Sequence, residues 1–145
     1  MPFISVTRLR IRSLFFLPAF AFHTLRSIRQ VRTAAGFLDG NLLPDRHRTY
    51  WTMTAWDSQE SMRRYMTAGA HKTAMAKLMN WCDEASVVHW EQSDSALPAW
   101  LEADRRMRAE GRASKVRHPS PQHATLTFAA PRLTRSGPIR PSQKH

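Results

Sequence analysis

His71 is the residue whose setting in the sequence best suits it to chemistry. It lies on an apolar stripe with Met75, Leu78 and Cys82, spaced as on a helix that buries one face. A neutral imidazole can act as a general base or as an axial haem ligand, because its ordinary pKa lies near neutrality. The alternative is a core histidine bonded to a carbonyl or a carboxylate, since an unpaired buried nitrogen costs about 1–3 kcal/mol.

Two further histidines are weaker candidates. His89 alternates with Val88 and Trp90, so it projects to the opposite side of a predicted strand, toward a cavity or a structural stack. His23 lies beside aromatic residues of the first predicted helix. The three histidines do not have the sequence spacing of metal ligands, and the single cysteine, Cys82, rules out a multi-cysteine zinc site. We therefore predict no metal site.

Aromatic side chains are the second group that can form a site. Trp51, Trp56, Trp81 and Trp90 can line a pocket for a flat aromatic substrate, and Tyr65 is a further candidate substrate contact. The alternative is that these rings pack in the core or in a dimer interface, because aromatic residues dominate both.

Arg8 and Arg10 share one face of a predicted strand. If that face borders the pocket, the two guanidinium groups can bind an anionic group such as a phenolate or a propionate. The alternative is that they pair with acidic residues of the last predicted strand region, Asp83, Glu84 or Glu91.

Periodicity indicates the elements that position these side chains. Alternation of apolar and polar residues indicates strands, whereas a period near 3.6 indicates helices. Asp57 and Glu60 have the spacing of a capping box at one helix start, and Gly69 should bend or restart that helix. The predicted strands are 2–11, 37–43, 48–56 and 87–92, and the predicted helices are 14–33, 57–82 and 95–111.

This order predicts an α+β fold of the ferredoxin-like βαββαβ type, with an antiparallel sheet and an added C-terminal helix. Helices should cover one sheet face, and a ligand or a second sheet must cover the other, because large exposed apolar patches are rare. We therefore expect a homodimer that closes two sheets into an α+β barrel. Residues 1–111 form the predicted domain, and residues 112–145 form a basic, proline-containing tail that is largely flexible.

Charge and length restrict the other partners. The chain of 145 residues has a net charge of +11, with no acidic residue before Asp39 or after Glu110. The basic ends could attract nucleic acid or anionic lipid, but a solvated tail is the simpler reading, so a nucleic-acid partner is not expected. Arginines followed by the apolar run 14–21 imitate a signal peptide, yet cleavage there would remove the first strand. The run is far shorter than the roughly 20 residues of a membrane span, so we expect no span and a cytoplasmic protein.

The run W-D-S-x-E-x-M-x-x-Y-M-x-x-G-x-H at residues 56–71 resembles the second helix entry of the antibiotic biosynthesis monooxygenase-like superfamily of dimeric α+β barrels. Segments 6–13, 35–43 and 81–92 resemble its wider frame, so the similarity covers roughly residues 3–110. The chain is similar to a bacterial branch of unassigned function that is often labelled spheroidene monooxygenase-like.

The resemblance implies several activities. Some members of the superfamily are cofactor-independent oxygenases of polycyclic phenols, some degrade or bind haem, and others have no known catalysis. Haem-degrading members have a tryptophan and a histidine where this chain has Tyr65 and Met75, which argues against that mechanism. His71 matches the histidine that follows a small residue in the general family.

Three functional hypotheses follow from these residues and this resemblance. In the first, the pocket binds a planar apolar molecule and His71 deprotonates or orients a phenol that dioxygen oxidises, without a cofactor. In the second, the protein binds haem without degrading it, with His71 or His89 as axial ligand. In the third, it is a non-catalytic binding module whose basic tail contacts an anionic partner.

Overall fold

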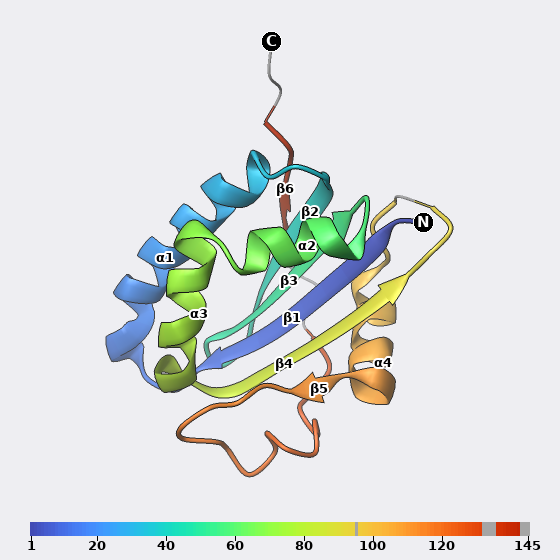
Figure 1. The fold of residues 1–145 in the computed structure, drawn as a ribbon. Coiled ribbons are helices and arrows are strands. Elements are labelled where there is room, and N and C mark those ends of the chain that lie inside the picture. Colours follow the sequence, from blue (N-terminus) through green and yellow to red (C-terminus); the bar gives the residue numbers. More distant parts are fainter. Residues whose placement is uncertain (95, 132–135, 143–145) are drawn as a thin grey trace.

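Within the part of the chain that the structure describes, a six-stranded antiparallel sheet runs through the centre, in the order β5-β4-β1-β3-β2-β6 (Figure 1). The computed structural model describes residues 1–94, 96–131 and 136–142. The strands are β1 (Phe3–Ile11), β2 (Phe37–Asp45), β3 (Thr49–Trp56), β4 (Cys82–Glu91), β5 (Arg112–Ala113) and β6 (Gly137–Ile139).

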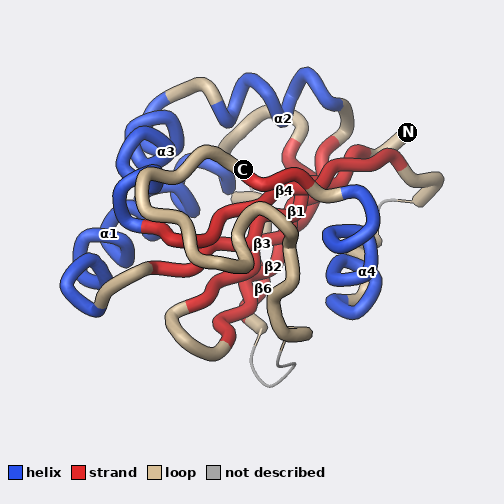
Figure 2. The backbone as a smooth tube through the Cα atoms, turned by 90° about the horizontal axis from the view of Figure 1, so that it is seen from below, coloured by secondary structure: helices blue, strands red, loops and turns tan. Residues whose placement is uncertain are grey.

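Helices α1 (Leu17–Arg32), α2 (Gln59–Met66) and α3 (Gly69–Trp81) cover one face of this sheet, and α4 (Trp100–Glu110) lies against the other (Figures 1 and 2). A 3₁₀ turn, Leu14–Phe16, precedes α1 and is capped by the side chain of Ser13. The predicted ferredoxin-like α+β fold with an added C-terminal helix is thereby confirmed. Among the described residues, no helix combines the length and apolarity that a membrane span requires.

The central strand β1 fixes the register of the sheet. Val6 is paired with Met53 on one side and with Val88 on the other, and all three are buried on the α4 face. The next row, Thr7, Thr52 and Val87, points to the opposite face because successive side chains of a strand alternate. This alternation separates the sheet residues that can meet a ligand beneath α1 and α3 from those that pack against α4.

Two predicted boundaries on the second helical segment need correction. The side chain of Ser58, not Asp57, caps α2 by accepting a hydrogen bond from the Ser61 N–H. The segment does restart at Gly69, whose φ of +56° is a conformation that glycine adopts most easily. The helix then ends at Trp81, and Cys82 begins β4, which is therefore five residues longer at its start than predicted.

The second face of the sheet is covered by the chain itself. We expected a barrel-closing dimer because we assumed that this face needed a ligand or a second sheet to cover it. Ala103 and Met107 of α4 and Phe128 of the C-terminal segment pack there against Trp51 and neighbouring core residues. The helix begins at Trp100, while Ser95, where the predicted helix starts, lies outside the described residues. The homodimer stays a prediction, but covering this face no longer requires one.

The C-terminal segment returns to the sheet at both edges. Arg112–Ala113 pair with β4, and Gly137–Ile139 pair with β2. Residues 124–130, which have the composition of a strand, instead form a turn and irregular backbone that carries Phe128 onto the core. The tail described here therefore contributes to the packing of the domain, and its binding to an anionic partner stays a prediction.

Candidate functional site

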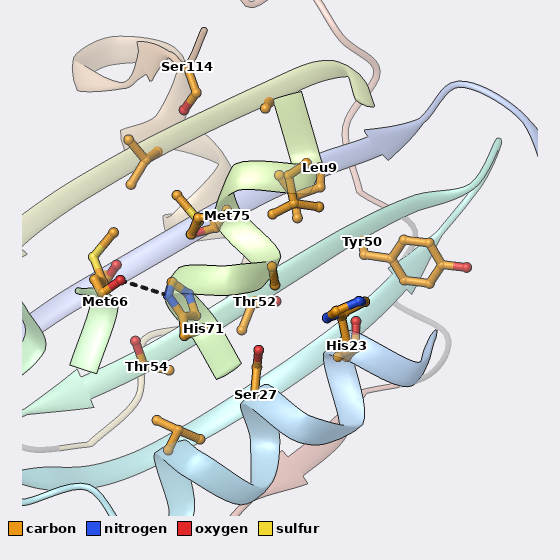
Figure 3. A pocket seen from close by; sticks show the side chains of 18 of the residues that line it. Leu9, His23, Ser27, Tyr50, Thr52, Thr54, Met66, His71, Met75 and Ser114 are labelled. Atoms are coloured by element: carbon orange, nitrogen blue, oxygen red, sulfur yellow. Dashed lines mark hydrogen bonds between the residues drawn. The ribbon is translucent and has the colours of Figure 1, made fainter. Parts of the chain in front are cut away.

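An apolar cavity of about 620 Å³ lies between the sheet and the helices α1, α2 and α3 (Figure 3). Cavities of this size commonly hold small organic molecules. Strands β1, β3 and β4 form its floor, and the first turns of α3 bring His71 over that floor. Its lining includes Ser5, Thr7, Ser27, Ile28, Thr52, Thr54, Trp56, Tyr65, Met66, His71, Met75 and His89.

The floor of the cavity carries small polar side chains. Thr7 pairs with Thr52, and Ser5 pairs with Thr54, so four hydroxyl groups lie together on this face. Short hydroxyl side chains leave volume open that Leu or Phe would fill. The cavity therefore exists because the two central strands place Ser and Thr opposite the helices.

The local hydrogen bonds of His71 define its tautomer. Its Nδ1 lies 3.3 Å from the carbonyl oxygen of Met66 (Figure 3). Because a carbonyl oxygen can only accept, Nδ1 of the neutral ring carries the proton and Nε2 keeps its lone pair. The ring also packs against Tyr65, with 4.4 Å between ring centroids. His71 thus presents an unprotonated nitrogen at the wall of the cavity.

Gln30 of α1 holds the segment that carries His71. Its Oε1 accepts the backbone N–H of His71 at 2.8 Å, and its Nε2 donates to the carbonyls of Tyr65 and Ala68 at 3.2 and 2.8 Å. One side chain therefore satisfies three backbone groups at the break between α2 and α3. Sequence reasoning missed Gln30, because a glutamine in an amphipathic helix has no pattern that marks it.

The other two pocket histidines each have a buried nitrogen without a hydrogen-bond partner among the described residues. These atoms are Nε2 of His89 and Nδ1 of His23. His89 packs against Phe3, and His23 packs against Trp81, at centroid distances of 5.4 and 5.5 Å. An unpaired buried polar atom costs about 1–3 kcal/mol, so a ligand hydroxyl or carbonyl that reached either nitrogen would recover that cost.

Burial lowers the pKa of all three histidines below the usual value of 6.5. For His71, burial outweighs the bond to Met66, which raises the pKa. For His89, burial acts together with the positive charges of Arg112 and Arg63, and for His23 it acts with those of Lys77 and Arg26. The three rings are therefore neutral at pH 7, as a base or a ligand must be.

This lowering predicts that the folded protein loses stability as the pH falls below about 6.5. In that range the unfolded chain binds protons at these histidines while the folded chain does not, so the free energy of unfolding decreases. Urea unfolding measured from pH 8 to pH 5 should show this fall, and His71→Gln should reduce its slope. A free energy of unfolding that stays constant or rises toward pH 5 would contradict the lowered pKa values of these histidines.

Trp56 and Tyr65 line the cavity as predicted candidates, and both are held rigidly. Trp56 is fully buried, donates from Nε1 to Thr54 at 2.9 Å, and packs 5.3 Å from the Tyr65 ring. The Tyr65 hydroxyl donates to the Ser27 carbonyl at 3.2 Å, and burial raises its pKa. Tyr65 therefore stays protonated and shapes the wall.

Four other candidates lie on the opposite face of the sheet. Trp51 and Trp90 belong to the core beneath α4. Arg8 donates to Glu84 at 2.7 Å, and Arg10 binds both oxygens of Asp83 at 2.9 and 2.7 Å. The sequence left open whether these arginines bind an anionic ligand group or pair with acidic residues, and the structure confirms the pairing. None of these four side chains lines the cavity.

The segment after α4 closes one end of the cavity. Arg112, Ser114, Lys115 and Val116 line it, and the Ser114 N–H donates to the Ala85 carbonyl at 2.7 Å. His123 fixes the same segment through a 2.8 Å contact between Nε2 and the Ser114 carbonyl. Sequence reasoning missed this wall, because residues 112–116 have neither a strand nor a helix period.

The described residues contain no cluster of three or more His, Cys, Asp or Glu side chains that could hold a metal ion. Cys82 is buried, and burial raises the pKa of its thiol to about 12. A thiol with so high a pKa is a packing group at neutral pH. The chemistry available in the cavity is that of neutral imidazoles, hydroxyl groups, aromatic walls and the two cations Arg112 and Lys115.

Comparisons with known proteins agree with this fold. A family model described as "Domain of unknown function (DUF3291)" matches residues 26–131. No curated protein matches the chain. Solved structures do match, and those described below are 18% identical or less, so their likeness shows the fold alone.

Three of these structures illustrate the likeness. Rv0793 from Mycobacterium tuberculosis has a TM-score of 0.59 at 13% identity, covering 67% of this chain and all of that one. SnoaB from Streptomyces nogalater, a cofactor-independent oxygenase, has a TM-score of 0.53 at 18% identity, covering 68% and 98%. A protein of Nitrosomonas europaea, provisionally named an antibiotic biosynthesis monooxygenase, has a TM-score of 0.56 at 12% identity, covering 63% and 89%. The resemblance noted at residues 56–71 is therefore confirmed for the fold.

Proposed function

This chain belongs to the DUF3291 family of domains of unknown function, and we propose that it is a small monooxygenase-like protein that binds a planar apolar phenol or quinol. One observation carries the proposal: the neutral Nε2 of His71 stands at the wall of an apolar cavity of about 620 Å³. SnoaB, which has a similar fold, is a cofactor-independent oxygenase. This likeness supports the proposal that the present chain is an oxygenase too.

The proposed reaction begins when Nε2 of His71 accepts the proton of a substrate hydroxyl. The Met66 carbonyl then stabilises the imidazolium, because it already accepts the Nδ1 proton. Negative charge spreads onto a ring carbon of the phenolate, and that carbon reduces dioxygen and forms a carbon–oxygen bond. The resulting hydroperoxide loses water to give a quinone, so one phenol and one O₂ yield one quinone and one H₂O. The phenolate supplies the electrons, so this chemistry needs no flavin or metal.

The lining of the cavity supports an orientation for the proposed substrate. Trp56, Tyr65 and Met66 form an apolar wall, which favours a flat ring and excludes water. The rings of His89 and His23 also line the cavity, and each has a buried nitrogen without a partner among the described residues, which a rotation of the side chain would bring to an oxygen atom of the ligand. A polycyclic phenol with more than one oxygen substituent fits this distribution of polar atoms.

Filling the cavity should weaken ligand binding. Thr52 is a half-buried floor residue, so Thr52→Phe places a ring where the ligand would lie. We expect it to weaken the binding of naphthols and naphthoquinols at least about tenfold, since the displaced ring loses more than 1.4 kcal/mol of burial. Fluorescence quenching of the chain's tryptophans provides the measurement, and an oxygen electrode follows turnover of the same compounds.

Thr73→Phe is the matched control, because Thr73 lies on the exposed side of α3 and does not line the cavity. It should leave ligand binding and oxygen consumption unchanged. Equal binding by both variants would show that the ligand lies elsewhere. Absence of oxygen consumption by the unmodified protein with every phenol and quinol that it binds would refute the oxygenase function while leaving the binding site in place.

Haem binding without degradation is a second candidate, and it is favoured by His89, which lines the cavity and whose Nε2 has no hydrogen-bond partner within the described part of the chain. A haem needs an axial nitrogen and cations for its propionates, and Arg112 and Lys115 line the cavity together with His89. Bound haem would supply redox chemistry at its iron. Titration with haemin should then give a Soret band that His89→Ala abolishes and His118→Ala, at an exposed histidine, preserves. The lack of any spectral shift would exclude this candidate.

A further inference from the structure

Large apolar side chains are exposed together on α1 and the turn before it. Phe15 is 83% exposed, Leu14 68%, Leu25 63% and Phe22 56%. Phe22 and Leu25 are three residues apart in α1, so they lie on the same side of that helix, and Leu14 and Phe15 lie in the 3₁₀ turn that leads into it. Single exposed apolar residues are normal, but a continuous group of this kind marks an interaction surface.

This group reaches the rim of the cavity. Leu25 of α1 and Met75 of α3 are both exposed and both line the cavity, so they belong at once to the surface and to the cavity's mouth. We call Leu14, Phe15, Phe22, Leu25 and Met75 the α1 face. The α1 face is therefore continuous with apolar side chains of the cavity lining.

Basic residues surround the α1 face, and acidic residues are absent from both helices that form it. Arg26 and Arg29 of α1 and Lys72 and Lys77 of α3 are exposed, while neither helix sequence contains Asp or Glu. The Arg26 guanidinium lies 5.7 Å from the centroid of the Phe22 ring, so charge and apolar surface are interleaved. An apolar centre with a basic rim is the composition of helices that lie in a membrane interface.

We infer that the α1 face docks on an anionic lipid surface and that the cavity takes up its apolar ligand there. The exposed Phe and Leu side chains would enter the boundary between headgroups and acyl chains, and Arg26, Arg29, Lys72 and Lys77 would contact lipid phosphates. Docking of a second copy is disfavoured, because it would bring two basic faces together. The phosphates of a nucleic acid would pair with the basic side chains, but they would leave Phe15 and Leu14 without an apolar environment.

The docking surface does not depend on catalysis, although the uptake of ligand rests on the function proposed above. The two ideas fail separately: a chain that binds vesicles but no phenol would refute the proposed function alone. A chain that binds phenols but no vesicles would refute the docking surface alone.

Sedimentation with lipid vesicles tests the docking surface on the full-length chain. The unmodified protein should bind vesicles of phosphatidylcholine with phosphatidylglycerol, bind pure phosphatidylcholine far more weakly, and dissociate as salt is raised. The double substitution Phe15→Ser with Phe22→Ser should reduce binding about tenfold or more, because two rings lose their burial. Both side chains are exposed, so the unfolding midpoint should stay unchanged and report an intact fold.

Leu101→Ser is the matched control, because Leu101 is 59% exposed on α4, which lies on the other face of the sheet. It should bind vesicles like the unmodified chain. Equal loss in both variants, or no binding to anionic vesicles, would overturn the inference. Concentration-dependent self-association that the double Phe substitution abolishes, without vesicle binding, would overturn it in favour of a second copy as the partner.

Discussion

Glu84→Ala is expected to lower the free energy of unfolding by about 3–5 kcal/mol, because it removes the hydrogen-bonded carboxylate partner of a buried arginine. Arg8 and Glu84 are both buried, with 2.7 Å between Nη1 and Oε1. Burial lowers the pKa of Arg8, and Glu84 opposes that effect through its hydrogen bond and its charge. The same carboxylate binds Arg10 at 3.1 Å and accepts from the Ser120 hydroxyl at 2.9 Å, so three partners lose contact together.

Glu102→Ala gives the matched comparison at an exposed ion pair. Glu102 binds Arg105 and Arg106 on the surface of α4 at 2.6 and 2.9 Å. Water already screens such pairs, so this change should lower the free energy of unfolding far less than Glu84→Ala does. Urea unfolding of both variants at pH 7 provides the measurement. Equal losses of stability would show that Arg8 and Glu84 are not isolated from water as the structure places them.

The second large effect is expected at the proposed base. His71→Ala should reduce kcat/KM for phenol oxidation by about 10²–10⁴-fold, which is the usual contribution of a positioned base. His71→Gln keeps a hydrogen-bond acceptor that cannot take the proton, so it should preserve KM and lose kcat. An oxygen electrode measures both constants. The unfolding midpoint of each variant separates loss of chemistry from loss of fold.

His118→Ala serves as the control, because His118 is exposed and does not line the cavity. It should retain full activity. If His71→Ala keeps its kcat/KM within a few-fold of the unmodified protein, His71 is a packing residue and another group must act as base. If His71→Gln loses binding as well as kcat, the ring holds the wall in place rather than removing a proton.

The order of elements could be predicted from the sequence because each signal is local. Residues 48–56 alternate clearly enough to define β3, and Gly69 marks the restart of the second helical segment. The helix end and the start of β4 were misplaced because Cys82 continues the helical period by chance. The cap was assigned to Asp57 because Asp57 and Ser58 are both good caps, and only the backbone angles distinguish them.

The cavity was only partly predictable. Trp56, Tyr65 and His71 follow one another closely along the chain, so a strand, a turn and a helix bring them to one wall. Trp51 and Trp56 are an odd number of residues apart on one strand, so alternation alone places them on opposite faces. Gln30 and the segment that begins at Arg112 reach the site from distant parts of the chain, and no local period indicates such contacts.

A crystal structure of the complex with a polycyclic phenol tests the central claim most directly. That claim is that the cavity beneath α1 and α3 is the ligand site and that His71 faces the reacting hydroxyl. The structure should show the ring against Trp56 and Tyr65, with the hydroxyl oxygen about 2.6–3.2 Å from Nε2 of His71. A ligand bound outside the cavity, or bound within it with its hydroxyl directed away from His71, would contradict the account.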